Sequence, residues 1–277
     1  MNTINVTTEI ITPEIARVYL TRNIVNRRIT ESRVNSYAEE MKKGLWQVNG
    51  DAIRFSKSGN LIDGQHRLKA CILADVQFQT LVIRGLNDDS FVTIDNGKPR
   101  SSCDVFYISD IENANQVSTI VKKHIILSKE THNVVASNRG HGSASSRVGN
   151  SIVLSTYNEN KDFYQEANKL SRSCYESCRA FNPSDIGAYF CYLVLNKKHP
   201  KEEVKEFFLQ LCDKKSEEYS MIRQCRKMFV NDRISNYHME AGVRQRLIIK
   251  AWNYFIQKRD VQQFRYNSEK DKDIWFI

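Results

Sequence analysis

Five consecutive residues, Asp63-Gly64-Gln65-His66-Arg67, combine a flexible backbone with charged and polar side chains suited to anion binding. Glycine lets the chain turn where a side chain would clash, and the first N–H groups of any helix lack acceptors within that helix. The positive end of a helix dipole and the guanidinium of Arg67 both favour a negative ligand, above all a phosphate. The same residues are also compatible with an ordinary Asp-Gly turn followed by a solvated first helical turn.

The elements on either side must place this loop at the end of a strand and the start of a helix. Loose apolar alternation that turns at Ser58-Gly59-Asn60 and resumes at Leu61-Ile62 predicts a β-hairpin leading into the loop. The elements predicted here, in chain order, are a helix from Thr30 or Ser32 to Lys43, a hairpin over 46–62, a helix over 65–73, a strand over 80–83 and a helix capped by Ser101 or Ser102.

Beyond residue 105 the apolar residues recur at helical spacing. Helices are predicted over 115–128, 151–157, 161–179, 184–196, 201–212, 219–229 and 240–257. The chain is therefore predicted to be α+β, with a small mixed sheet and helices in residues 1–105 and an all-α domain in residues 106–277. Trp252, Phe255 and Ile256 share one helical face and are expected in the core rather than in a base-stacking platform.

The order of elements resembles the N-terminal fold shared by ParB partition proteins and sulfiredoxin, the ParB/Srx superfamily. The resemblance covers about residues 15–105 and includes four short motifs: Asn26-Arg27, Gly44-Leu45-Trp46, Asp63-Gly64-Gln65-His66-Arg67-Leu68 and Thr93-Ile94-Asp95-Asn96-Gly97. In this detailed form, and again in the segment Ile248–Phe255, the chain is similar to a group of proteins found in phages and mobile elements.

The resemblance implies a nucleotide site. The ParB loop that binds nucleotide phosphates corresponds to Gly64–Arg67, and a second ParB motif that helps hold triphosphate and metal looks like Asp95-Asn96 with Arg100, at a spacing longer by one residue. The implied ligands are CTP or ATP with Mg²⁺, the metal lying at Asp95 and Asn96. The implied phosphate contacts are Gly64, Gln65, His66, Arg67, Asp95, Asn96 and Arg100. The alternative for Asp95-Asn96-Gly97 is an ordinary turn.

Two classes of function follow from this likeness. The first is a nucleotide-binding switch that controls contact with DNA or a protein partner. The second is an enzyme, either a phosphotransferase or NTPase or a ParB-like nuclease, with Asp63 and His66 as catalytic residues and Asp51 as another possible base. Gln65 stands where sulfiredoxin has its cysteine, so sulfinic-acid reduction is not expected. A structural phage protein that binds no nucleotide is a third possibility.

The formal net charge of +9 permits contact with nucleic acid. The best candidate stripe is formed by Arg223, Arg226 and Lys227, followed by Arg233, Arg244 and Arg246. Solvated helix faces would have a similar sequence.

The seven cysteines form no CxxC pair, and the N-terminal residues lack a signal-peptide pattern, so we expect reduced thiols and a cytoplasmic protein, in the host cytoplasm if phage-encoded. Cys174 and Cys178 lie about one helical turn apart. They could bind a metal with His199 or Cys191, although small buried thiols are the simpler interpretation.

Overall fold

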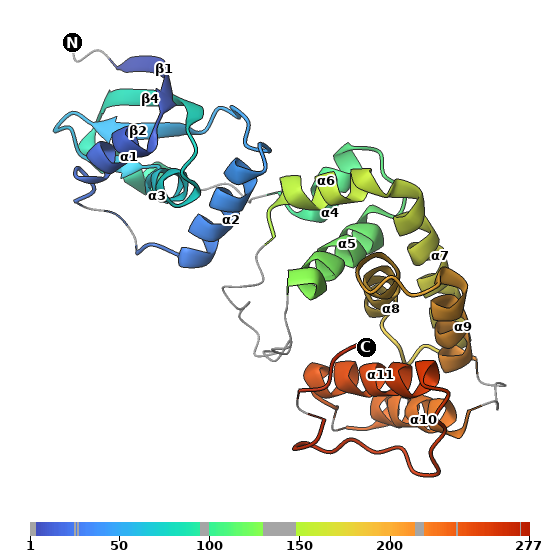
Figure 1. Ribbon diagram of the computed structural model, residues 1–277. Coiled ribbons are helices and arrows are strands. Elements are labelled where there is room, and N and C mark those ends of the chain that lie inside the picture. The colour runs from blue at the N-terminus through green and yellow to red at the C-terminus, as the bar shows by residue number, and fades with distance from the viewer. Residues whose placement is uncertain are drawn as a thin grey trace. The chain divides into compact units, whose positions relative to one another are not determined.

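The computed structural model describes residues 4–24, 26, 28–94, 100–129, 148–213, 219–236, 238–271 and 273–277. The chain divides into two compact units, one comprising Met1–Arg100 with Ser143–Ile152 and the other Ser101–Gly142 with Val153–Ile277 (Figure 1). The first unit holds a mixed sheet with helices, and the second is helical. The predicted α+β class, with a small mixed sheet followed by a helical region, is confirmed.

The sheet has four strands in the order β1 (Asn5–Ile11), β4 (Phe78–Leu86), β2 (Ala52–Ser56) and β3 (Leu61–Asp63). β4 runs antiparallel to β1 and parallel to β2, while β2 and β3 form an antiparallel pair. The predicted hairpin and the strand near 80–83 are therefore confirmed. Strand β1 was not predicted from the sequence.

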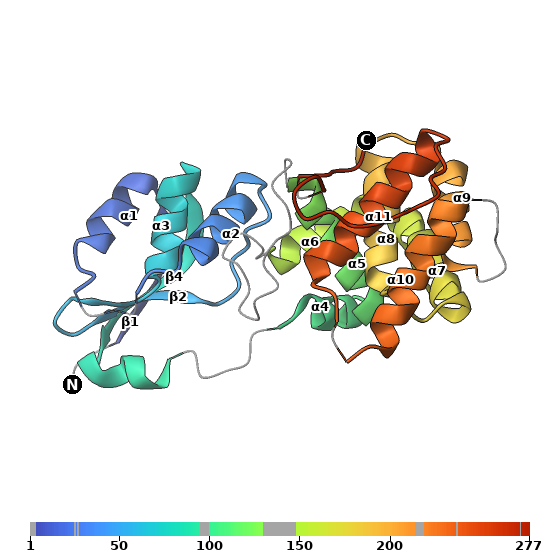
Figure 2. The ribbon, with the colours of Figure 1, turned by 90° about the horizontal axis from the view of Figure 1, so that it is seen from below.

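Three helices cover one face of the sheet: α1 (Pro13–Leu20), α2 (Glu31–Lys42) and α3 (Gln65–Ala74) (Figure 2). Their apolar stripes and the inward residues of the strands form one core, which includes Val34, Ile53 and Leu68. α2 and α3 confirm the helices predicted over 30–43 and 65–73. A short 3₁₀ helix, η1 (Asp88–Thr93), follows β4.

A polar network joins α1 to the sheet. Arg84 on β4 donates to both carboxylate oxygens of Glu9 on β1, at 2.6 and 3.2 Å. The hydroxyl of Tyr19 on α1 donates to Glu9 over 2.6 Å. These hydrogen bonds stabilise the ionised form, the bond from Arg84 most of all, and lower the pKa of Glu9 to about 2.

The described residues after residue 100 form a series of helices. They are α4 (Ser102–Ile108), α5 (Ala114–Lys129), α6 (Asn150–Glu159), α7 (Lys161–Ser177), α8 (Pro183–Cys191) with a π-helical turn η3 (Tyr192–Asn196), α9 (Lys201–Cys212), α10 (Ser220–Ile234) and α11 (Ala241–Ile256). Each predicted helix of this region has its counterpart. Ser101 caps α4 in a capping box with Asp104, as its position predicted.

The core of the helical unit confirms the roles predicted for Trp252 and Phe255. Trp252 is fully buried on α11 and packs edge-on against Phe207 of α9, with ring centroids 5.3 Å apart. The C-terminal segment returns to this core, because the indole N–H of Trp275 donates to the hydroxyl of Tyr192 over 2.9 Å. The segment is therefore part of the folded unit.

Candidate functional site

The loop between β3 and α3 depends on the glycine at its centre. Gly64 has φ +106° and occupies the N-cap position of α3. A Cβ placed there would lie 2.4 Å from Cδ1 of Ile53 on β2, closer than real contacts allow. Both the left-handed backbone and the close approach to β2 therefore require glycine.

A charged cluster lies beside the loop. Arg54 on β2 and Asp63 on β3 are partners in the hairpin register, and the Arg54 guanidinium forms an ion pair with Asp63 Oδ2. Nη2 of Arg67, on the first turn of α3, also donates to Asp63 Oδ2, at 3.0 Å. The other carboxylate oxygen, Oδ1, accepts the N–H of Gly64 over 2.7 Å. Two guanidinium groups thus share one carboxylate, and the cluster keeps one net positive charge.

Arg67 is the most deeply placed member of this cluster, since only 7% of the residue is exposed. Its Nη2 donates to the carbonyl of Ala52 over 2.7 Å as well as to Asp63. Its other terminal nitrogen, Nη1, is buried and has no hydrogen-bond partner among the residues that the structure describes. A charged donor without an acceptor in a buried place is costly, and an anionic oxygen would satisfy it.

Gln65 and His66 are also buried, with 4% and 6% of each residue exposed. Both side chains form hydrogen bonds with residues of the segment between α1 and α2. Asn23 donates through Nδ2 to Gln65 Oε1 over 3.1 Å. The backbone N–H of Thr30 donates to Nε2 of His66 over 3.0 Å, so this nitrogen acts as an acceptor. These bonds connect the start of α3 to the segment before α2 and give both side chains a structural role.

The remaining residues predicted for the nucleotide site lie in other surroundings. Asp95 and Asn96, expected to hold phosphate and metal, fall outside the described residues. Arg100 is exposed just before α4. Asp51, considered as a base, is exposed immediately before β2. The structure therefore brings Asp63, Gly64 and Arg67 together, and it adds Arg54, which the sequence reading missed.

The hairpin by itself would not have paired Arg54 with Asp63. Phe55 lies opposite Leu61, so regular pairing would place Arg54 opposite Ile62, but the register shifts between Arg54 and Phe55 and brings Arg54 opposite Asp63. The available signal was only the presence of an arginine and an aspartate on the two strands of one predicted hairpin.

The predicted nucleic-acid stripe is wrong in part. Arg223 and Lys227 are exposed on α10, as expected. Arg226 lies between them but is only 6% exposed, and it donates to the carbonyls of Gln210 and Leu211 at the end of α9 over 2.6 and 2.9 Å. Residues three apart on a helix lie only about 60° apart around its axis, so spacing alone places Arg223 and Arg226 on nearly the same side. The burial of Arg226 comes instead from the packing of α10 against the end of α9.

Six of the seven cysteines are buried and Cys103 is half-buried, and none of the seven forms a disulfide. Cys174 and Cys178 are each 1% exposed. Within the described ranges no group of three or more His, Cys, Asp or Glu side chains is arranged to hold a metal ion, so the zinc-type alternative at these two cysteines is not supported. Their burial fits small apolar side chains.

None of the described helices is both long enough and apolar enough to cross a bilayer. Comparisons of the sequence with protein-family models and curated proteins, and of the structure with solved structures, found no match.

Proposed function

We propose that the first unit binds the phosphates of a nucleoside triphosphate at the start of α3, with Arg67 and Arg54 as the anchoring cations. The observation that carries this proposal is the buried Nη1 of Arg67, which lacks an acceptor among the described residues. A phosphate oxygen would supply that acceptor, and phosphate is an anion that both helix N-termini and guanidinium groups bind.

The charged neighbours of Arg67 are more exposed than Arg67 itself. The side chains of Arg54 and Asp63 are 24% and 17% exposed, against 9% for Arg67. An incoming phosphate would meet Arg54 first and compete with the Asp63 carboxylate for both guanidinium groups. In the absence of ligand, the Asp63 carboxylate takes the place of the phosphate and reduces the repulsion between the two guanidinium groups.

In this proposal the loop binds the nucleotide phosphates and does not catalyse a reaction on them. A general base needs a carboxylate oxygen free to accept a proton, whereas the two oxygens of Asp63 already accept from Arg54, Arg67 and the N–H of Gly64. His66 has Nε2 occupied by the N–H of Thr30. Phosphoryl transfer or hydrolysis is therefore the alternative that a turnover assay must exclude.

The test is isothermal titration calorimetry with ATP, CTP, GTP and tripolyphosphate, each with and without Mg²⁺. Tripolyphosphate separates recognition of the phosphates from recognition of the base. Arg67→Lys keeps the positive charge but removes the guanidinium group, and with it the N–H donors of Nη1. Arg54→Gln removes the more exposed of the two positive charges. Arg17→Gln, an exposed arginine on α1, is the matched control, with circular dichroism to verify folding.

We expect wild type and Arg17→Gln to bind equally, and each site variant to bind at least about tenfold more weakly, a difference of about 1.4 kcal/mol. Absence of binding by the wild type, or full binding by both folded site variants, would overturn the proposal. Release of inorganic phosphate that is lost in Asp63→Asn would show that the loop performs chemistry.

A further inference from the structure

The helical unit contains two neighbouring hollows that the nucleotide proposal does not use. Their volumes are about 460 and 360 Å³, and both are lined by Tyr175, Arg179 and Pro183. Arg172 on α7 lines the first hollow and Arg233 at the end of α10 lines the second. The shared residues show that the two hollows adjoin one another, and we call them together the α7–α10 groove.

The groove is positively charged. None of its guanidinium groups at Arg172, Arg179 and Arg233 has an ion-pair partner within the described ranges. Arg172 is held in place by a hydrogen bond of 3.0 Å to Oδ1 of Asn113, a neutral acceptor that leaves its charge uncompensated. Unpaired guanidinium groups gathered along a concavity concentrate a positive field that attracts anionic ligands.

Two carboxylates also line the groove, and they do not cancel this charge. Asp232 in the second hollow has only 3% of its side chain exposed and forms an ion pair with Arg244. Arg244 is further held by the carbonyl of Ala180, at 2.7 Å, and by the ring of Phe229, 4.6 Å from its guanidinium carbon. Glu176 in the first hollow removes one charge, which leaves an excess of two.

An aromatic side chain lies among these cations. Tyr175 on α7 is 37% exposed and lies about one helical turn from Arg172. Arg179 follows two residues after Ser177, the last residue of α7. Pro183 adds a second apolar surface at the start of α8. An exposed ring between guanidinium groups matches the alternation of bases and phosphates along an unpaired strand.

We propose that the α7–α10 groove binds single-stranded nucleic acid, with Arg172, Arg179 and Arg233 on the phosphates and Tyr175 stacked against a base. A duplex keeps its bases within the helical stack, where the Tyr175 ring does not reach them, so an unpaired strand is the better fit. This inference is independent of the nucleotide site, because every residue that carries it belongs to the helical unit.

The test is fluorescence anisotropy of a 5′-labelled 20-nucleotide poly-dT strand and of a 20-base-pair duplex, titrated with the full chain at 50 and 200 mM salt. The principal variant is Arg172→Glu/Arg179→Glu. The matched control is Arg223→Glu/Lys227→Glu, which makes the same charge change on the exposed face of α10 outside the groove. Tyr175→Ala removes the ring and no charge, and circular dichroism verifies that each variant is folded.

We expect the groove variant to bind the single strand at least about tenfold more weakly, and to show a smaller loss of affinity between the two salt concentrations. Tyr175→Ala should weaken binding about fivefold while leaving that salt dependence unchanged. The control should stay within about twofold of wild type.

Three results would overturn the inference. The first is no binding of the single strand by wild type at 50 mM salt. The second is an equal or larger effect of Arg223→Glu/Lys227→Glu, which would locate the contact on the α10 face. The third is tighter binding of the duplex than of the single strand, which would assign the cations to a double helix.

Discussion

Asp63 is the last residue of β3 and Arg67 lies four residues later on α3; Nη2 of Arg67 donates to Oδ2 of Asp63 over 3.0 Å, while Arg54 pairs with the same oxygen. The carboxylate therefore compensates two cations in a place where all three side chains are largely buried. Such an arrangement makes Asp63 important for folding and, at the same time, a competitor of any anionic ligand.

The substitution Asp63→Asn separates these two effects. Removing one partner from a buried ion pair leaves an uncompensated charge, so we expect the free energy of unfolding to fall by about 3 kcal/mol in urea titrations. Affinity for tripolyphosphate should rise severalfold, because the competing carboxylate is gone. Asp51→Asn, at an exposed position next to β2, is the control and should change neither quantity. A loss of phosphate affinity in Asp63→Asn would mean that the carboxylate assists binding.

Gly64→Ala tests the close approach of the loop to β2. Alanine must adopt φ +106° there and bring its Cβ to 2.4 Å from Cδ1 of Ile53. Gly44→Ala is the matched control, since Gly44 also has positive φ, at +65°, but no atom lies within 4 Å of the added Cβ. We expect a cost of about 1 kcal/mol for Gly44→Ala, and of about 3 kcal/mol for Gly64→Ala.

A double mutant distinguishes the clash from the backbone strain. Ile53→Val removes Cδ1, the atom in closest contact, so Gly64→Ala should cost less in the Ile53→Val background than in wild type. Denaturant titrations of the four proteins provide the cycle. Strict additivity would show that the conformation of Gly64, and not its contact with Ile53, sets the cost.

Glu9 gives the first unit a pH dependence. Its folded-state pKa of about 2 lies below the ordinary value of 4.5, so folding favours the ionised carboxylate. The resulting stability is present above about pH 5 and is lost as the pH falls through 4.5 toward 2. We expect Glu9→Gln to be less stable than wild type by about 1 kcal/mol at pH 7, a value reduced for solvent screening of a partly exposed pair, and equal to it near pH 2.

Because other carboxylates titrate in the same range, the informative quantity is the difference between the two proteins at each pH. Urea titrations at several pH values between 2 and 7 measure it. A difference that stays constant over this range would show that Glu9 acts through packing, and the ion pair with Arg84 would then contribute nothing to folding.

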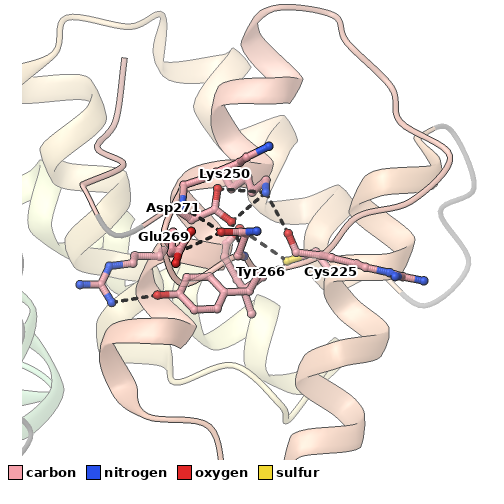
Figure 3. A network of polar contacts seen from close by, with 10 residues as sticks. Cys225, Lys250, Tyr266, Glu269 and Asp271 are labelled. Carbon is pink, nitrogen blue, oxygen red and sulfur yellow. Dashed lines mark hydrogen bonds and ion pairs between the residues drawn. The ribbon is translucent and has the colours of Figure 1, made fainter.

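The C-terminal segment is held by a buried ion pair on α11 (Figure 3). Nζ of Lys250 lies 3.0 and 2.8 Å from the carboxylate oxygens of Asp271 and donates to the carbonyl of Arg265 over 2.8 Å. The backbone N–H of Asn267 donates to the same carboxylate, at 2.7 Å. The lysine and the aspartate side chains are 14% and 8% exposed.

Asp271→Asn should therefore destabilise the helical unit by about 3 kcal/mol and increase the rate of proteolysis within 258–277. Glu269→Gln is the control, because its carboxylate belongs to an exposed residue two positions away. In the double variant Lys250→Met/Asp271→Leu, both charges are gone, and part of the lost stability should return. Unchanged proteolysis in Asp271→Asn would show that packing of Trp275 holds the segment by itself.

The sequence determined the local features of this protein. Helical spacing of apolar residues, a serine at the start of α4 and the turn at 58–60 act within a few residues, so their consequences could be inferred directly. The Asp63–Gly64 turn into α3 was found in the same way. β1 and α1 were missed, although the β-branched run Asn5–Ile11 and the Thr12-Pro13 helix start carried the signals.

Only the tertiary structure decided which charges meet. Arg54 lies opposite Asp63 because the β2–β3 register shifts between Arg54 and Phe55, and Arg226 is buried because α10 packs its side chain against the end of α9. The groove cations Arg172 and Arg233 come from helices about sixty residues apart. Spacing along a chain fixes neighbours on one element, whereas contacts between elements depend on how their apolar faces pack together.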